Sequence, residues 1–225
     1  MSGIFITGTD TGVGKSVVTG FLAKYLQAKG FKVITQKWMQ TGSCFSMDIN
    51  QHLKIMGVAK SVVKAHLQDV CPYIFKLPAS PHLAAKVEKR RIRISKIKKS
   101  FKLLSSKFDF VIVEGIGGTL VPINKKRLVI DIAYELNLPV LVVAQNKLGA
   151  INQVLMTIEA LKHRKLKILG IIFNNCPGQN SRILKDNPNI IREITGENIL
   201  GVLPWEKRIS LLYKKFLPIA LKIII

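Results

Sequence analysis

Gly8-Thr-Asp-Thr-Gly-Val-Gly-Lys15-Ser16 is the most informative segment of this chain. It follows a short apolar run, residues 4–6, and precedes an amphipathic stretch from Val17 to Lys29. A strand, a glycine-rich turn ending in Gly-Lys-Ser and a helix form a phosphate-binding loop, because backbone amides, a lysine and a helix N-terminus all attract phosphate oxygens. A plain surface turn is the alternative, and the flanking strand and helix argue against it. The sequence therefore predicts that Lys15 binds phosphates and that the Ser16 hydroxyl can hold Mg²⁺.

The spacing inside this loop narrows the class of protein. Five residues, rather than the usual four, separate Gly8 from Gly14. The partitioning and division-site ATPases carry a second lysine early in the loop, where this chain has Asp10. The chain therefore has the loop of that superfamily without its signature lysine.

Length and composition predict one aliphatic α/β domain. The chain has 225 residues, 48% of them hydrophobic and only 7% aromatic, and we expect a single domain over residues 1–225. Because the phosphate loop begins at residue 8, we expect no signal peptide. The apolar residues 216–225 are too few to span a bilayer, so they predict a packed helix or strand.

The cysteines and the charge bear on compartment and partners. Cys44, Cys71 and Cys176 have neither disulfide-framework nor zinc spacing, which favours a reducing, cytoplasmic location. The net charge of +22 can mark nucleic-acid or membrane binding. Its densest stretch, residues 86–107, also carries an apolar stripe at helical spacing. We interpret this as a surface helix, with a polyanion, membrane or partner site as the alternative, and expect neither a specific nucleic acid nor a membrane as partner.

Apolar runs alternate with helical periodicity along the chain. The runs are residues 3–7, 32–36, 110–114, 140–144, 168–174 and 199–203. Such a pattern predicts a mostly parallel sheet with helices on both faces, which with the loop gives an α/β fold of the phosphate-loop NTPase type. Ligands of such folds lie at the carboxyl ends of the strands.

Two of these strand ends carry charge. Lys37 follows the second run, where it can meet a transferring phosphate or a substrate oxyanion; a solvated surface lysine is the alternative. The third run ends in Glu114, which predicts support for Mg²⁺. The glycines of residues 115–118 allow backbone amides to approach a ligand, although a structural turn with a capping glutamate would look the same.

Two other strand ends suggest a site for a base. The fifth run ends in Asn174-Asn175, whose amides can read a purine edge or form an Asx turn before Pro177. The sixth ends in Pro204-Trp205, a turn that can flank the base.

Taken together, these motifs resemble the dethiobiotin synthetases of biotin biosynthesis. The matching segments appear in family order: residues 8–16, 37–42, 80–82, 113–118, 147–149 with 151–152, 174, and 201–205. They cover the chain from residue 3 to about residue 206. The five-residue loop spacing and the Glu-Gly-x-Gly-Gly motif are the most specific of them.

The resemblance implies a homodimeric cyclo-ligase that joins 7,8-diaminononanoate, CO₂ and ATP into dethiobiotin, ADP and phosphate. In the family, a substrate amine captures CO₂ as a carbamate, the carbamate attacks the γ-phosphate, and the second amine closes the resulting carbamoyl-phosphate-type anhydride into a ring. Lys15 and Lys37 would neutralise charge along this route.

The resemblance also implies the residues of the site. Mg²⁺ would be held by Ser16, Asp48 and Glu114. ATP would be bound by Gly12, Val13, Gly14, Lys15, Ser16, Val17, Asp48, Glu114, Gly115, Ile116, Gly117, Asn174, Asn175, Pro204, Trp205 and Glu206. The substrate would be bound by Thr11, Thr41, Gly118 and Asn152. Asn152 lies at a predicted helix start, a suitable place for a carboxylate, and in the family this region reaches the substrate of the neighbouring subunit.

The chain departs from the family pattern at three places. Gly12 stands where many members carry an acid, Trp38 follows Lys37 where proline is usual, and Asp48 lies in a segment of variable length.

Two other classes of protein compete with this interpretation. Another amidoligase-like synthase would normally need a glutaminase domain, for which these residues leave no room. A ParA/MinD-like ATPase switch would use the basic surface, but Asp10 argues against it.

Overall fold

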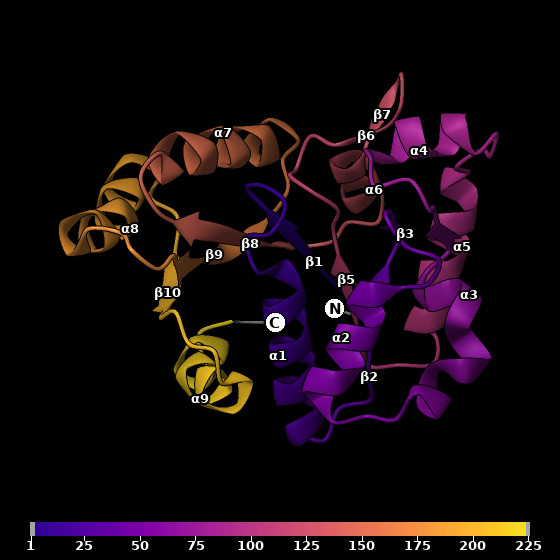
Figure 1. Ribbon diagram of the computed structural model, residues 1–225, viewed down its shortest axis with the longest axis horizontal. Helices are drawn as coiled ribbons and strands as arrows, with labels where there is room; N and C mark the ends of the chain where they lie inside the picture. Colours follow the sequence, from indigo (N-terminus) through magenta and orange to yellow (C-terminus); the bar gives the residue numbers. More distant parts are fainter. Residues whose placement is uncertain (1–2, 224–225) are drawn as a thin grey trace.

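A parallel β-sheet forms the centre of the protein (Figure 1). The computed structural model describes residues 3–223, and the sheet order is β10-β9-β8-β1-β5-β2. The strands are β1 (Gly3–Gly8), β2 (Val33–Lys37), β5 (Phe110–Glu114), β8 (Val140–Asn146), β9 (Ile168–Asn175) and β10 (Ile199–Leu203). All neighbouring strands in it pair in parallel. The six predicted strands and the parallel sheet are therefore confirmed.

Helices cover both faces of this sheet. On one face lie α1 (Lys15–Ala28) and α9 (Ile209–Ala220), and on the other α5 (Ile94–Ser105), α6 (Val129–Glu135), α7 (Ala150–His163) and α8 (Ser181–Thr195). Successive strand side chains point to opposite faces. Ile4 and Ile6 thus pack under α1, whereas Phe5 belongs to the other core.

The connection from β2 to β5 holds short elements that the sequence pattern did not predict. They are β3 (Met39–Gln40), α2 (Met47–Met56), the 3₁₀ helix η1 (Lys60–His66), α3 (Leu67–Val70), β4 (Tyr73–Ile74) and α4 (Pro81–Val87). A small antiparallel pair, β6 (Pro122–Asn124) and β7 (Arg127–Leu128), follows β5. The β2–β5 connection matters for function because α2 packs beside α1 and builds one wall of the site.

The predicted surface and terminal helices are both present. In α5, Ile97, Phe101 and Leu104 are buried while Lys99 and Lys102 are exposed, so the predicted helix with an apolar stripe and exposed lysines is present. In α9, Phe216 and Ile219 are buried; residues 224–225 of the predicted terminal element lie outside the described residues. Within residues 3–223, no helix has the length and apolarity that crossing a membrane requires.

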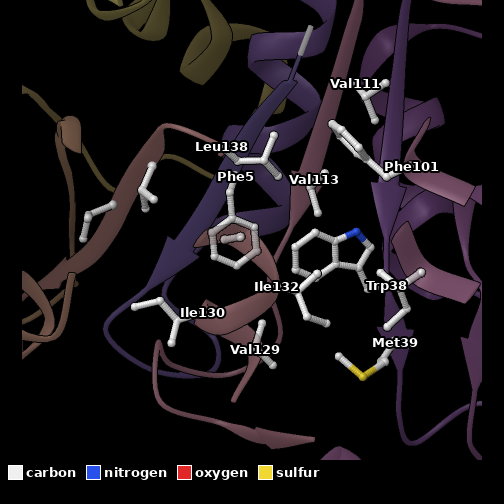
Figure 2. Close-up of a cluster of buried hydrophobic side chains, with 14 of the residues drawn as sticks. Phe5, Trp38, Met39, Phe101, Val111, Val113, Val129, Ile130, Ile132 and Leu138 are labelled. Atoms are coloured by element: carbon white, nitrogen blue, oxygen red, sulfur yellow. The ribbon is translucent and has the colours of Figure 1, made fainter. Parts of the chain in front are cut away.

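Trp38 explains one departure from the family pattern (Figure 2). Its indole is 1% exposed, stacks on Phe5 at 5.2 Å between ring centroids, and donates from Nε1 to Gln36 Oε1 at 2.9 Å. Lys37, in contrast, lines the functional cavity described below. Trp38 therefore fills the core behind the site and does not displace Lys37 from it.

Candidate active site

The phosphate loop depends on glycine at two positions. Gly12 has φ 74° and Gly14 has φ 98°, a region that other residues rarely adopt. A Cβ on Gly14 would lie 2.2 Å from Asn174 Nδ2, and that same nitrogen donates to the carbonyl of Val13 at 2.6 Å. A hydrogen bond thus joins the end of β9 to the loop that follows β1, and it brings together Asn174 and Val13, two residues that the family resemblance assigned to ATP binding.

A cavity of about 750 Å³ opens beside the loop, at the carboxyl ends of β1, β2 and β5. This size suits a small-molecule site. The predicted residues that line it are Thr11, Gly12, Gly14, Lys15, Ser16, Val17, Lys37, Thr41, Asp48, Glu114, Ile116 and Gly117. Gln40, Gln51 and the segment 78–81 also line it; Gln40 lies within the motif at residues 37–42, the segment overlaps the motif at residues 80–82, and Gln51 lies in neither.

A buried charge cluster forms the floor of the cavity. Lys37 and Glu114 are register partners on adjacent strands, and Lys37 Nζ lies 2.8 Å from both Glu114 Oε1 and Asp48 Oδ2. Burial alone would lower the pKa of Lys37, but the two carboxylates outweigh it and raise that pKa. Burial alone would raise the pKa of Glu114, but Lys37 and a hydrogen bond from His52 lower it to about 2. Lys37 and Glu114 are therefore both charged at neutral pH.

Lys15 is a further cation of the cavity, and no carboxylate among residues 3–223 forms a salt bridge with it. Its Nζ donates to the carbonyls of Asp10 at 2.7 Å and Gly117 at 2.8 Å. Burial and repulsion by Lys37 lower the pKa of Lys15 to about 8. An anion bound between Lys15 and Lys37 would relieve this repulsion, so the cavity is electrostatically suited to phosphate or carboxylate groups.

The oxygen donors around the cluster fit Mg²⁺. The Ser16 hydroxyl donates to Glu114 Oε1 at 3.0 Å and lies 3.4 Å from Asp48 Oδ1. Hydroxyl and carboxylate oxygens are the ligands that this ion prefers, and it usually takes only one or two carboxylates from the protein. Asp48 keeps a side-chain exposure of 22% and lines the cavity, whereas both oxygens of Glu114 already accept hydrogen bonds. Ser16 and Asp48 are therefore the more accessible donors.

One residue of this cluster was not predicted from the sequence. His52 is fully buried, and its Nε2 lies 2.7 Å from Glu114 Oε2. It follows Asp48 by four residues on α2, so both side chains lie on one face of the helix. This four-residue spacing is the only sequence feature that links His52 to the predicted metal ligand Asp48.

The predicted base-binding residues lie at the β9–β10 end of the sheet. Leu203 of β10 pairs with Asn174, so Pro204, Trp205 and Glu206 continue directly past it, with Trp205 54% exposed. The Asn175 side chain instead accepts a hydrogen bond from Asn146 Nδ2 at 2.9 Å.

The remaining predicted residues, Gly115, Gly118 and Asn152, do not line the main cavity. Gly115 is buried, and its carbonyl accepts from Lys37 Nζ at 2.7 Å. Gly118 lines a second cavity of about 300 Å³ between the segment after β5 and α7. Asn152 is exposed in the first turn of α7, a predicted helix start that is confirmed, and lines neither cavity.

Known proteins are similar in sequence to this chain over most of its length. A family model described as an AAA domain matches residues 2–211. The ATP-dependent dethiobiotin synthetase BioD 2 of Haemophilus influenzae is 42% identical over 191 residues, which span 84% of this chain and 98% of that protein. The chain belongs to the dethiobiotin synthetase family. A dethiobiotin synthetase of Thermodesulfovibrio yellowstonii is 35% identical over 216 residues, 91% of this chain and 89% of its own length. The family predicted from the motifs is thus confirmed, and with it the expectation of an ATP-dependent ligase.

Solved structures confirm the fold of this dethiobiotin synthetase family member. MinD of Aquifex aeolicus superposes with a TM-score of 0.58 at 18% identity, covering 98% of this chain and 89% of that one. A putative plasmid partition protein of Borrelia burgdorferi, bound to AMPPNP, gives 0.59 at 16% identity, with 99% of each chain covered. At these identities the likeness concerns the fold, which is the predicted phosphate-loop type.

Proposed function

We propose that this chain is a dethiobiotin synthetase: it carboxylates 7,8-diaminononanoate with CO₂ and closes the ureido ring with ATP, releasing ADP and phosphate. The observation that carries the proposal is the pair of lysines in one cavity, Lys15 from the phosphate loop and Lys37 from the floor. It is supported by identities of 35–42% to named synthetases over most of the chain.

The proposed mechanism relies on charge neutralisation. A carbamate and a γ-phosphate are both anionic, so bringing them into contact requires preorganised positive groups more than a strong base. Lys37 is held charged by Glu114 and Asp48 at the floor, where it would meet the carbamate and the transferring phosphoryl group. Lys15 and the amides of the loop would bind the β- and γ-phosphates.

Mg²⁺ would be held by Ser16 and Asp48, with Glu114 in support, and when bound it would screen the phosphate charge. Lys37, Ser16 and His52 already hydrogen-bond to the oxygens of Glu114. Glu114 would therefore act mainly by holding these residues in place. Thr11 and Thr41 line the same cavity and would contact the diamine.

Adenine would lie at the β9–β10 end of the sheet. Asn174 donates its amide hydrogen to Val13, and its amide oxygen would accept a hydrogen bond from a purine amino group. Trp205 is half exposed beside it and would flank the base together with Pro204 and Glu206.

We further propose that the enzyme is a homodimer whose interface completes the substrate site. The second cavity is lined by Gly118, Leu120 and Met156, the last two about half exposed, and exposed apolar groups around a cavity mark interaction surfaces. Asn152, in the first turn of α7, would reach the carboxylate of a substrate bound to the other subunit. The free cysteines Cys44, Cys71 and Cys176 agree with a cytoplasmic enzyme.

The experiment that tests this function measures phosphate release from Mg-ATP with bicarbonate, with and without 7,8-diaminononanoate. We expect release to require both, with dethiobiotin as the product. ATP hydrolysis that is indifferent to the diamine would overturn the substrate assignment.

A ParA/MinD-like switch is the second candidate, favoured by the fold comparison and the charge of +22. Binding of duplex DNA as a function of NaCl separates the two. We expect only nonspecific binding that weakens steeply with salt. Salt-resistant, sequence-selective binding would instead support the switch.

A further inference from the structure

We propose that His52 is a positioning residue for the active site: its Nε2–H holds one oxygen of Glu114 so that the other faces Lys37 and Ser16. The inference rests on the proposed function. His52 does not line the cavity, so its part in that function would be exerted through Glu114.

The hydrogen bonds of Glu114 are divided between its two oxygens. Oε1 accepts from Lys37 at 2.8 Å and from Ser16 at 3.0 Å, whereas Oε2 lies 2.7 Å from His52. The carboxylate is 2% exposed, so water cannot replace a lost partner. The terminal torsion of a glutamate is broad. Without His52, Oε2 would be buried and unpaired, and the carboxylate could turn away from Lys37.

The direction of this hydrogen bond follows from the state of Glu114. Its carboxylate forms a buried ion pair with Lys37 at 2.8 Å, and an ionised carboxylate can only accept. His52 Nε2 must therefore carry the hydrogen. The other ring nitrogen, Nδ1, is buried and has no hydrogen-bond partner among the residues that the structure describes. Among the described residues, the imidazole therefore hydrogen-bonds to Glu114 only.

Packing in the core does not by itself explain why position 52 is a histidine. Its neighbours on α2, Ile49 and Leu53, are buried apolar residues, and an apolar side chain at position 52 would leave no unpaired ring nitrogen. One turn earlier, Asp48 contacts Lys37. A single helix therefore braces both members of the Lys37–Glu114 pair, the lysine through Asp48 and the glutamate through His52.

The test compares three variants in the steady-state assay. His52→Leu removes the donor at similar size, His52→Gln keeps an N–H donor of similar reach, and Leu53→Ala is a matched control that damages the same helix without touching the cluster. We expect His52→Leu to lower kcat about 10- to 100-fold, as for other residues that orient a ligand group, with the KM for the diamine within about twofold. His52→Gln should recover most of kcat. Leu53→Ala should lower Tm at least as much as His52→Leu and leave kcat near wild type.

Two outcomes would overturn the proposal: wild-type kcat in folded His52→Leu, or a loss that His52→Gln does not rescue and Leu53→Ala reproduces. If His52→Leu does not fold, the comparison of His52→Gln with His52→Asn, which is too short to reach Glu114, decides on the same criteria.

A spectroscopic measurement tests the contact independently of the substrate. In ¹⁵N-histidine-labelled protein, we expect a slowly exchanging Nε2–H signal from His52 that shifts in Glu114→Gln. A neutral ring protonated on Nδ1 would refute the positioning role even in an active enzyme. Wild-type protein that makes no dethiobiotin yet shows this signal would instead refute the proposed function.

Discussion

Replacing Lys37 by alanine removes the only cation in direct contact with two carboxylates of the cavity, as far as residues 3–223 show. Its Nζ lies 2.8 Å from both Glu114 Oε1 and Asp48 Oδ2. Asp48 keeps 22% side-chain exposure and can be solvated, whereas Glu114 is 2% exposed. The cost to folding therefore falls on Glu114, which loses its lysine and retains the hydrogen bonds from Ser16 and His52.

The size of both effects follows from this geometry. Breaking a buried ion pair by removing one partner costs about 3–5 kcal/mol, and because His52 and Ser16 still donate to Glu114, we expect about 3 kcal/mol. For a domain of this size that corresponds to a fall in Tm of about 6–12 °C. Loss of one preorganised charge at a developing anion costs about 10²–10³-fold in kcat, and we expect Lys37→Ala to reach at least the upper end.

The assay is diamine-dependent phosphate release, with ATP affinity measured separately by equilibrium binding. Affinity should stay close to wild type, because Lys15 and the loop amides remain. Lys99→Ala, an exposed lysine on α5, is the matched control and should change neither property. Full turnover in Lys37→Ala would refute the role of Lys37. A tenfold or larger loss of ATP affinity would refute the division of labour between the two lysines.

Further predictions concern the core and the loop. Trp38→Ala removes a 1%-exposed ring stacked on Phe5 and should lower the free energy of unfolding in urea by about 3–5 kcal/mol; a loss below about 1 kcal/mol would contradict the core assignment. Gly14→Ala forces a Cβ to 2.2 Å from Asn174 Nδ2 at φ 98°, which costs about 1–3 kcal/mol of strain. The Kd for a nonhydrolysable ATP analogue should therefore rise about tenfold, and an unchanged Kd would refute this prediction. The pKa of Lys15 is about 8 in the free protein, and bound phosphates raise it again, so ATP affinity should be constant below about pH 8 and weaken as pH rises above it. Calorimetry in two buffers at pH 8.5 should detect proton uptake on binding, and the absence of uptake would contradict this sign.

The elements and several of the functional residues could be predicted because their signals are local. The apolar runs, the glycine spacing of residues 8–16 and the amphipathic helix that follows are patterns of a few residues each. Parallel strands end at one edge of a sheet, so Lys37 and Glu114 were expected near the loop, and the resemblance added Asp48 from a segment with no clear pattern. The short elements between β2 and β5 were missed because each has too few residues to show a period.

The contacts between these residues depend on how distant segments of the chain pack together. Placing β5 between β1 and β2 makes Lys37 and Glu114 register partners, and docking α2 beside α1 brings Asp48 and His52 onto that pair. Strand order and helix docking are set by the burial of surfaces contributed by segments far apart in the chain, which no local pattern reports. The sequence therefore determined the fold class and the chemistry available at the strand ends. Packing determined that Trp38 became core, that Asn174 was attached to the loop, and that a histidine without a motif came to hold Glu114.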